Sequence, residues 1–151
     1  MTLIETSVKT FLAADSTLVG LIAAANIVTF DETKRNGIGI LSTPTLFTDG
    51  VLEPVLMIRE ETEGWFGGIR DSGAKVRSTG TRICCYFLVD GDVGYTNLET
   101  ARDRVVALLA DQIINTVGGF KWAGNLKPPR DSSLDNAAQL RTDFQVARLR
   151  G

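Results

Sequence analysis

Histidine is absent from this sequence, and its absence limits the chemistry that the other side chains can perform. Without histidine there is no Ser-His-Asp or Cys-His nucleophile system, and the common histidine-containing zinc sites are excluded as well. The two cysteines, Cys84 and Cys85, are adjacent, so on a strand their side chains point to opposite faces. A metal site would need more ligands than the chain offers. We therefore expect no metal site and two reduced thiols in a half-buried strand, because free cysteine is usually buried.

An acidic cluster of Glu60, Glu61, Glu63 and Asp71 is the best candidate for acid–base chemistry. Paired carboxylates can act as general acid and general base when a pocket raises the pKa of one of them. Here the four carboxylates flank a glycine-rich segment, which favours solvated side chains over a catalytic pair. We therefore expect that the protein is not an enzyme and that it uses no cofactor.

Three short motifs have a simpler structural explanation beside the functional one. The Gly-Ile-Gly motif at residues 37–39 lacks the third glycine and the strand–helix context of a phosphate-binding fingerprint, which favours a flexible turn. The Asp-Gly-Asp motif at residues 90–92 lacks the later ligands of a calcium loop and is explained by a turn. The Phe-Lys-Trp motif at residues 120–122, with Lys127 and Arg130, mixes aromatic and basic residues as single-strand binders do. A strand edge that packs on the core explains it better.

The length of 151 residues is typical of one domain, so we expect a single domain over residues 1–151. Apolar residues make up 44% and charged residues 23%, as in ordinary globular proteins. A net charge of −2 gives no basic footprint for sequence-specific binding of nucleic acid. No apolar run is long enough to span a bilayer, and the first residues do not resemble a signal peptide. We therefore expect no membrane partner and a location in the cytoplasm of the producing cell.

The clearest element that could position these residues is a helix over residues 95–114. Thr96 and Glu99 have the spacing of a capping box, in which each satisfies a free backbone group at the helix N-terminus. Apolar residues recur at three- and four-residue steps and predict one buried stripe. The stripe consists of Leu98, Ala101, Val105, Leu108, Leu109 and Ile113. Gly118 and Gly119 are expected to stop this helix.

The rest of the chain predicts a second helical region and several strands. Residues 3–22 show helical periodicity with an interruption at residues 15–17, where Asp, Ser and Thr can cap a new helix. Strands are expected near residues 26–30, 54–61, 76–89, 120–126 and 138–146. The last of these alternates, with Ala138, Leu140, Thr142, Phe144 and Val146 on one face and Gln139, Arg141, Asp143 and Gln145 on a wet face. The fold class is therefore α+β, a mainly antiparallel sheet with an N-terminal helical unit and one long helix packed on it.

Residues 31–53 have no periodicity and are expected to form a long loop, which is usually functional or mobile. They nevertheless carry many apolar side chains, which a solvated linker would not ordinarily do. One interpretation is an arm that is ordered against a neighbouring subunit or a tail tube, and the alternative is an extra hairpin folded on its own sheet. A second irregular segment, residues 63–75, places two aromatic residues between glycines. The candidate interface residues are Ile38, Ile40, Leu46, Phe47, Trp65 and Phe66.

The order of these segments resembles the tail terminator (tail completion) family of long-tailed bacteriophages. The resemblance rests on the opening FLAADSTLVGLIAA, the strand PVLMIREE, the strand ending CCYFLVD, the helix YTNLETARDRVVALLADQI and the closing strand LRTDFQVARLR. It spans nearly the whole chain as order and pattern, because the family has no sharp motif. The long segment at residues 31–53 and the glycine-rich segment at residues 63–75 depart from the family pattern.

The resemblance implies a structural protein that carries no catalytic residue. Such proteins form hexameric rings that cap the tail tube, end its polymerisation and offer a surface to the head connector or a head-closure protein. It implies a homohexamer in the tail or neck of a virion, assembled in the cytoplasm of a bacterial host, with a ring through which the genome can pass. The alternatives are another ring-forming neck or head–tail adaptor component, a tail tube subunit, or a small enzyme that uses the acidic cluster.

Overall fold

The structure, a computed structural model, describes residues 3–30, 44–62, 81–90, 95–114, 117–126 and 137–148. Its helices are α1 (Leu3–Ala13), α2 (Ser16–Leu21) and α4 (Tyr95–Leu109), with short 3-10 turns at Ala24–Asn26 and Pro44–Leu46. Its strands are β1 (Ile27–Thr29), β2 (Phe47–Thr48), β3 (Val51–Leu52), β4 (Val55–Thr62), β5 (Thr81–Asp90), β6 (Ile113–Ile114), β7 (Gly118–Leu126) and β8 (Ala137–Arg148).

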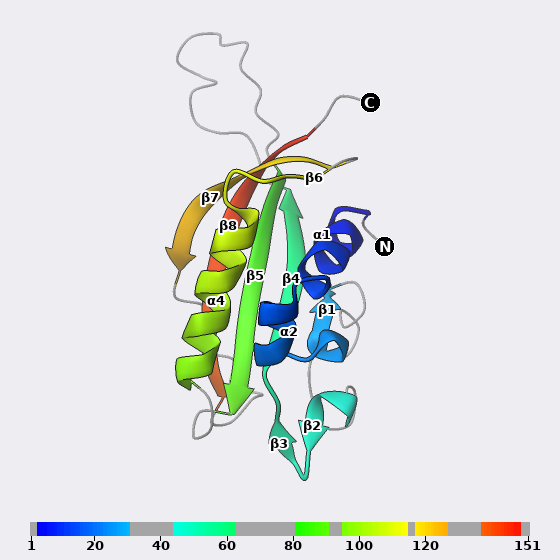
Figure 1. Ribbon diagram of the computed structural model, residues 1–151, viewed down its shortest axis with the longest axis vertical. Coiled ribbons are helices and arrows are strands. Elements are labelled where there is room, and N and C mark those ends of the chain that lie inside the picture. The colour runs from blue at the N-terminus through cyan, green and yellow to red at the C-terminus, as the bar shows by residue number, and fades with distance from the viewer. Residues whose placement is uncertain are drawn as a thin grey trace, which may run out of the picture.

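Six strands form one sheet in the order β1-β4-β5-β8-β7-β6 (Figure 1). Strand β1 pairs with β4 in parallel, and every other neighbouring pair in this sheet is antiparallel. The fold is therefore α+β with a mainly antiparallel sheet, as the sequence predicts. Strand β5 lies between two long neighbours, which explains why its later half is apolar on both faces.

Helices α1, α2 and α4 lie on one face of the sheet, and the hydrophobic core fills the space between the two layers (Figure 1). Helix α1 contributes Ile4, Val8 and Leu12, and the fully buried residues of α4 include Val105 and Leu109. The strands supply the other side of this core from alternate positions, among them Leu56, Ile58, Ile83, Cys85, Phe87, Leu140, Phe144 and Val146. We call this the helix-covered face and the opposite one the open face.

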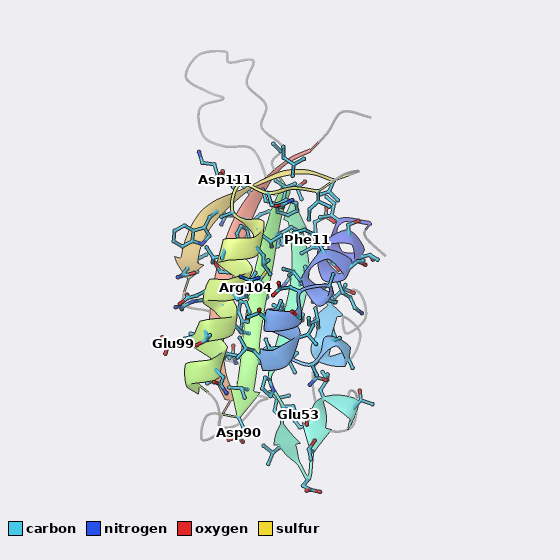
Figure 2. The ribbon with its side chains drawn as sticks, in the orientation of Figure 1. Phe11, Glu53, Asp90, Glu99, Arg104 and Asp111 are labelled. Atoms are coloured by element: carbon cyan, nitrogen blue, oxygen red, sulfur yellow. The ribbon has the colours of Figure 1, made fainter. Side chains whose placement is uncertain are left out.

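The break between the first two helices is capped as the sequence predicts. Asp15 is the N-cap of α2, and its Oδ2 atom accepts a 2.8 Å hydrogen bond from the backbone N–H of Leu18. The same carboxylate receives two bonds from Arg104 of α4, at 3.0 Å from Nε and 2.7 Å from Nη2. In Figure 2 Arg104 lies on the side of α4 that faces α2. This bidentate pair joins two helices that lie far apart in sequence.

Helix α4 ends at Leu109, so the prediction of a helix through residue 114 is wrong at its C-terminal end. Asp111 has a φ of 61°, in the left-handed region that most residues other than glycine avoid, and its N–H donates a 2.9 Å hydrogen bond to the carbonyl of Phe120. The next residues then pair with β7 as strand β6, because β-branched Ile113 and Ile114 suit a strand. Gly118 and Gly119, expected to stop the helix, lie in β7 instead.

The apolar stripe on α4 also differs from the expectation at two positions, Leu108 and Ile113. Val105 and Leu109 are fully buried, whereas Leu108 is half-buried at the margin of the core and Ile113 lies outside the helix. Leu98 and Ala101 are buried as expected. The helix therefore faces the sheet along the line through residues 98, 101, 105 and 109, and Leu108 lies to one side of that line.

Within the segment 31–53, residues 44–53 form a 3-10 turn followed by the small hairpin of β2 and β3. Leu46 and Leu52 are buried against Val55 and Leu88, which belong to the open face of the main sheet. This corresponds to the hairpin alternative for that part, and residues 31–43 lie outside the described residues. Glu53 holds the hairpin, accepting bonds from Thr48 Oγ1 at 2.7 Å and Asn26 Nδ2 at 3.2 Å, which lower its pKa. Figure 2 shows Glu53 at this end of the sheet.

Strand β4 continues beyond the end of β1. There the carboxylate of Glu5, from α1, lies beside β4 in place of a neighbouring strand. Pairing between the two strands ends at Thr29 and Ile58. Two residues later the N–H of Glu60 donates to Glu5 Oε2 at 2.8 Å, and Glu5 itself is buried. A side chain of α1 thus takes the hydrogen bond that a longer β1 would have made, which satisfies a half-buried backbone donor.

Candidate assembly surface

The open face of the sheet carries a polar network across β4, β5 and β8. Cross-strand pairs bring Arg59 opposite Cys84, Cys84 opposite Asp143, and Tyr86 opposite Arg141. Directly opposed residues in a sheet point to the same face, so these side chains lie together. The network therefore occupies the face that no helix covers within the described part of the chain (Figure 1).

Asp143 is the centre of this network and is completely buried. Its Oδ1 atom accepts a 2.8 Å hydrogen bond from Arg141 Nε, and its Oδ2 atom accepts from Arg141 Nη2 at 2.8 Å and Arg82 Nη1 at 3.2 Å. Three charge-assisted bonds replace the water that the carboxylate loses. Asp143 was expected on a wet face, and that expectation is wrong because the two arginine side chains lie over it.

Arg141 connects the buried carboxylate to the other groups of the open face. Its Nη2 atom lies 3.3 Å from Cys84 Sγ and 3.9 Å from Glu61 Oε2, and its guanidinium carbon lies 5.1 Å from the centre of the Tyr86 ring. Hydrogen bonding to Asp143 raises the pKa of Arg141 further above its ordinary value. Arg59 extends the network through a 3.6 Å contact with Glu61. Opposite charges therefore alternate along the face, from Arg59 through Glu61 and Arg141 to Asp143.

The two cysteines are buried, free and on opposite faces. Cys84 belongs to the open face beside Arg141, and Cys85 belongs to the core beneath the helices. Burial is the main reason that the pKa of Cys84 is raised to about 12, and burial raises the pKa of Cys85 as well. Neither thiol is therefore present as the reactive thiolate near neutral pH.

The acidic cluster of the sequence divides in the structure. Glu60 and Glu61 are neighbours on β4 and so point to opposite faces, and Glu61 pairs with arginines of the open face. Glu63 and Asp71 lie outside the described residues. Within the described ranges, no group of three or more cysteine and carboxylate side chains is placed to hold a metal ion. The motif at residues 37–39 lies outside these ranges, as do residues 91–92.

Of the six candidate interface residues, the structure describes two. Leu46 is buried under the hairpin in the second apolar cluster, and Phe47 is half-buried against the same cluster. Ile38, Ile40, Trp65 and Phe66 lie outside the described residues. Their role in an interface stays a prediction, and Leu46 already has its apolar neighbours within its own subunit.

Exposed apolar side chains lie instead at separate points along the edge formed by β6 and β7. The described chain has four large hydrophobic residues that are exposed, and three are on this edge: Ile113 at 64%, Trp122 at 45% and Leu126 at 43%. Phe120 is buried, and Trp122 Nε1 donates to Thr142 Oγ1 at 3.0 Å. The aromatic-basic motif therefore divides, with its first residue in the core and the next two exposed at a strand edge. Sequence reasoning expected this segment to pack on the core and missed the exposed part.

None of the helices in the described part of the chain is long and apolar enough to cross a membrane.

Comparison with known protein families and with curated proteins finds no match by sequence. Comparison with solved structures finds a chain of the virion of a native gene transfer agent (GTA) particle. The alignment covers 95% of this chain and 92% of that chain, with a TM-score of 0.58 and 13% sequence identity. At this identity the two chains share a fold, and the shared fold extends over nearly the full length of both.

Proposed function

We propose that this chain is a structural protein of a phage-like virion and that it acts as the tail terminator. In this role, copies of the chain form a ring, of six in the resembled family, that caps the tail tube and ends its polymerisation. The opposite side of the ring offers a surface to the head connector or head-closure protein. The ring is assembled in the cytoplasm of the bacterial host and remains in the tail or neck of the virion.

The observation that carries this proposal is the fold shared with a GTA virion chain over almost the whole of both chains. Because the match extends over nearly the whole of both chains, it supports the proposal that this chain is a virion protein of the same kind, and it is more than a shared supersecondary motif. The order of helices and strands that resembles the tail terminator family supports the finer role.

The chemistry of the described residues favours a structural protein over an enzyme. The carboxylates of the open face are held by arginines, and the two thiols have raised pKa values. The network holds these carboxylates in pairs with arginines, which suits a polar surface for contact with other proteins.

The decisive experiment deletes the gene for this chain from the genome that encodes the virion. The particles that are then produced are examined by negative-stain electron microscopy. A tail terminator predicts tubes of uncontrolled length that do not join heads, restored to normal length when the chain is supplied in trans. A head–tail adaptor predicts tails of normal length that are separate from filled heads. A tail tube subunit predicts no tails, and normal infectious particles would contradict all three roles.

A measurement on the purified chain tests the ring directly. Mass photometry should detect a species six times the 16.3 kDa subunit, and class averages should show flat rings with a central opening. Particles assembled without any ring of this chain at the end of the tube would contradict the proposal.

A further inference from the structure

The hairpin of β2 and β3 extends beyond the end of β5 and is fixed in that position (Figure 1). Its base is held by Leu46 and Leu52, which are buried in the second apolar cluster, and by the two hydrogen bonds that Glu53 accepts. Its turn has a positive φ at both central residues, 52° at Asp49 and 80° at Gly50, as in a type I′ turn. The tip of the hairpin therefore has a defined geometry before it meets any partner.

This tip presents an exposed apolar side chain beside a carboxylate. Thr48 pairs with Val51 across the hairpin, and the next pair along contains Leu52, which faces the buried cluster. Successive residues of a strand point to opposite faces, so Val51 faces away from the cluster, and it is 41% exposed. Asp49 is also exposed and forms no ion pair within the described chain. The tip thus offers one apolar contact and one unpaired negative charge.

A second exposed apolar side chain lies on the open face at the other end of the sheet. Ile113 is 64% exposed, and a Cβ atom placed on Gly119 would lie 3.9 Å from its Cγ1 atom. Ile113 pairs with Gly119, and Gly119 pairs with Ala147, which lies on the same face of β8 as Asp143. Lys121, two residues further along β7, is on this face as well and is exposed. We call Ile113 and Lys121 the β6–β7 corner.

Lys121 is a cation without an ion pair among the described residues. The arginines of the open face differ in this respect, because Arg59, Arg82 and Arg141 each contact a carboxylate. Asp111, which precedes β6 in the chain, does not pair with Lys121. The β6–β7 corner therefore combines an exposed isoleucine with an ammonium group that can accept a carboxylate from another molecule.

We propose that the tip of the β2–β3 hairpin of one copy binds the β6–β7 corner of a second copy of this chain. Val51 packs against Ile113, and Asp49 pairs with Lys121. The two surfaces are complementary in both respects, apolar against apolar and negative against positive. On each side the charge lies two residues along the strand from the apolar contact. Because the hairpin tip is already fixed, little conformational freedom is lost when it binds.

The two surfaces are too far apart to meet within one copy. The hairpin packs beside Leu88 near the end of β5, whereas Ala147 lies one residue beyond Val146, the partner of Thr81 at the start of β5. The residues Thr81 and Leu88 are separated by roughly 24 Å along an extended strand. Each copy therefore supplies its hairpin to one neighbour and its corner to another. Such a heterologous joint gives a ring when its rotation closes, so the inference rests on the proposed function and names the surfaces that form the ring.

A charge exchange across the joint tests the pairing in the full chain. Asp49→Lys and Lys121→Asp each place like charges together, and each should raise the protein concentration for half-assembly by roughly tenfold or more in mass photometry. The double variant restores opposite charges at every joint and should assemble close to wild type. Asp103→Lys is the control, because it makes the same change of charge at a 71% exposed position on α4 and should leave assembly unchanged. Circular dichroism and thermal melting confirm that each variant is folded.

A crosslink tests the same contact without changing a charge. A Val51→Cys/Ile113→Cys variant, oxidised after assembly, should give a ladder of multiples of the 16.3 kDa chain on a non-reducing gel. Each single cysteine variant should give no ladder, because the native Cys84 and Cys85 are buried. Absence of the ladder, wild-type assembly of both single charge variants, or no recovery in the double charge variant overturns the inference. A wild-type chain that stays monomeric also overturns it, while the gene-deletion phenotype separately decides the proposed function.

Discussion

The Asp143→Asn substitution tests the polar network at its most buried atom. The asparagine keeps the shape of the carboxylate but removes its charge, and its amide group directs N–H bonds toward Arg141 or Arg82. If the amide nitrogen takes the place of Oδ1, one of the three guanidinium bonds is replaced by a contact between two donors, and if it takes the place of Oδ2, two are. We expect a large loss of stability from one substitution that leaves the size of the side chain unchanged.

The magnitude follows from burial and from the number of bonds. Removing one partner of a buried ion pair costs about 3–5 kcal/mol, because the other charge is left uncompensated. The side chains of Arg82 and Arg141 remain 26% and 17% exposed, so water restores part of their solvation. We therefore expect a loss of about 2–4 kcal/mol in the free energy of unfolding. For a domain of this size that corresponds to a fall in Tm of roughly 4–16 °C.

Urea denaturation followed by circular dichroism measures this loss, and the control is Asp103→Asn. Asp103 also pairs with an arginine, at 3.5 Å from Arg102, but its side chain is 71% exposed. Exposed pairs contribute about 0–1 kcal/mol, so this variant should unfold close to wild type. A double-mutant cycle with Arg141→Met should show strong coupling to Asp143. Equal losses in Asp143→Asn and Asp103→Asn would refute the buried network.

Three further predictions concern the core, the helix junction and the thiols. Leu109→Ala should cost on the order of 2–5 kcal/mol by urea denaturation, because Leu109 is fully buried, and half-buried Leu108→Ala should cost clearly less; the reverse order would place the helix in the wrong register. Hydrogen bonds from Arg104 and the Leu18 backbone lower the pKa of Asp15 from 3.8 to about 2. Their stabilising contribution is therefore complete above about pH 4 and lost toward pH 2, so Asp15→Asn should reduce the fall in Tm measured across that range. A thiol reagent at neutral pH should leave Cys84 and Cys85 unmodified in the folded chain and react with both after denaturation; rapid labelling of the native chain would contradict their burial.

The sequence predicted the elements whose pattern depends on local sequence alone. The N-cap at Asp15, the strand β4 and the apolar face of β8 follow from local sequence, because caps and alternation report directly on backbone geometry and burial. The central position of β5 was also predictable, since a strand covered on both faces is apolar on both. The α+β class follows from these elements together.

The errors arose where distant residues decide the outcome. Residues 113–114 continue a helical pattern, but pairing with β7 gives them a strand neighbour and overrides the helical preference. Asp143 reads as a solvated residue because alternation cannot reveal that Arg82, 61 residues earlier in the chain, lies over its carboxylate. The exposed edge of β7 was missed for a similar reason, since its exposure depends on how short β6 is. Its signal was the Phe-Lys-Trp motif at residues 120–122, where one aromatic is buried and the other exposed.

The position of β8 has a consequence for when the subunit becomes competent to assemble. It is the last strand of the described chain, yet it lies between β5 and β7 in the sheet. During synthesis, β4 and β5 can pair as soon as both have emerged, and β6 and β7 can form their own short hairpin. These two halves share no strand until residues 137–148 are available to join them. Contacts this distant in sequence form slowly because a long loop must close first. The sheet is therefore completed, and β7 fixed beside β8, only after residues 137–148 have been translated. This separates the synthesis of each copy from its incorporation into an assembly.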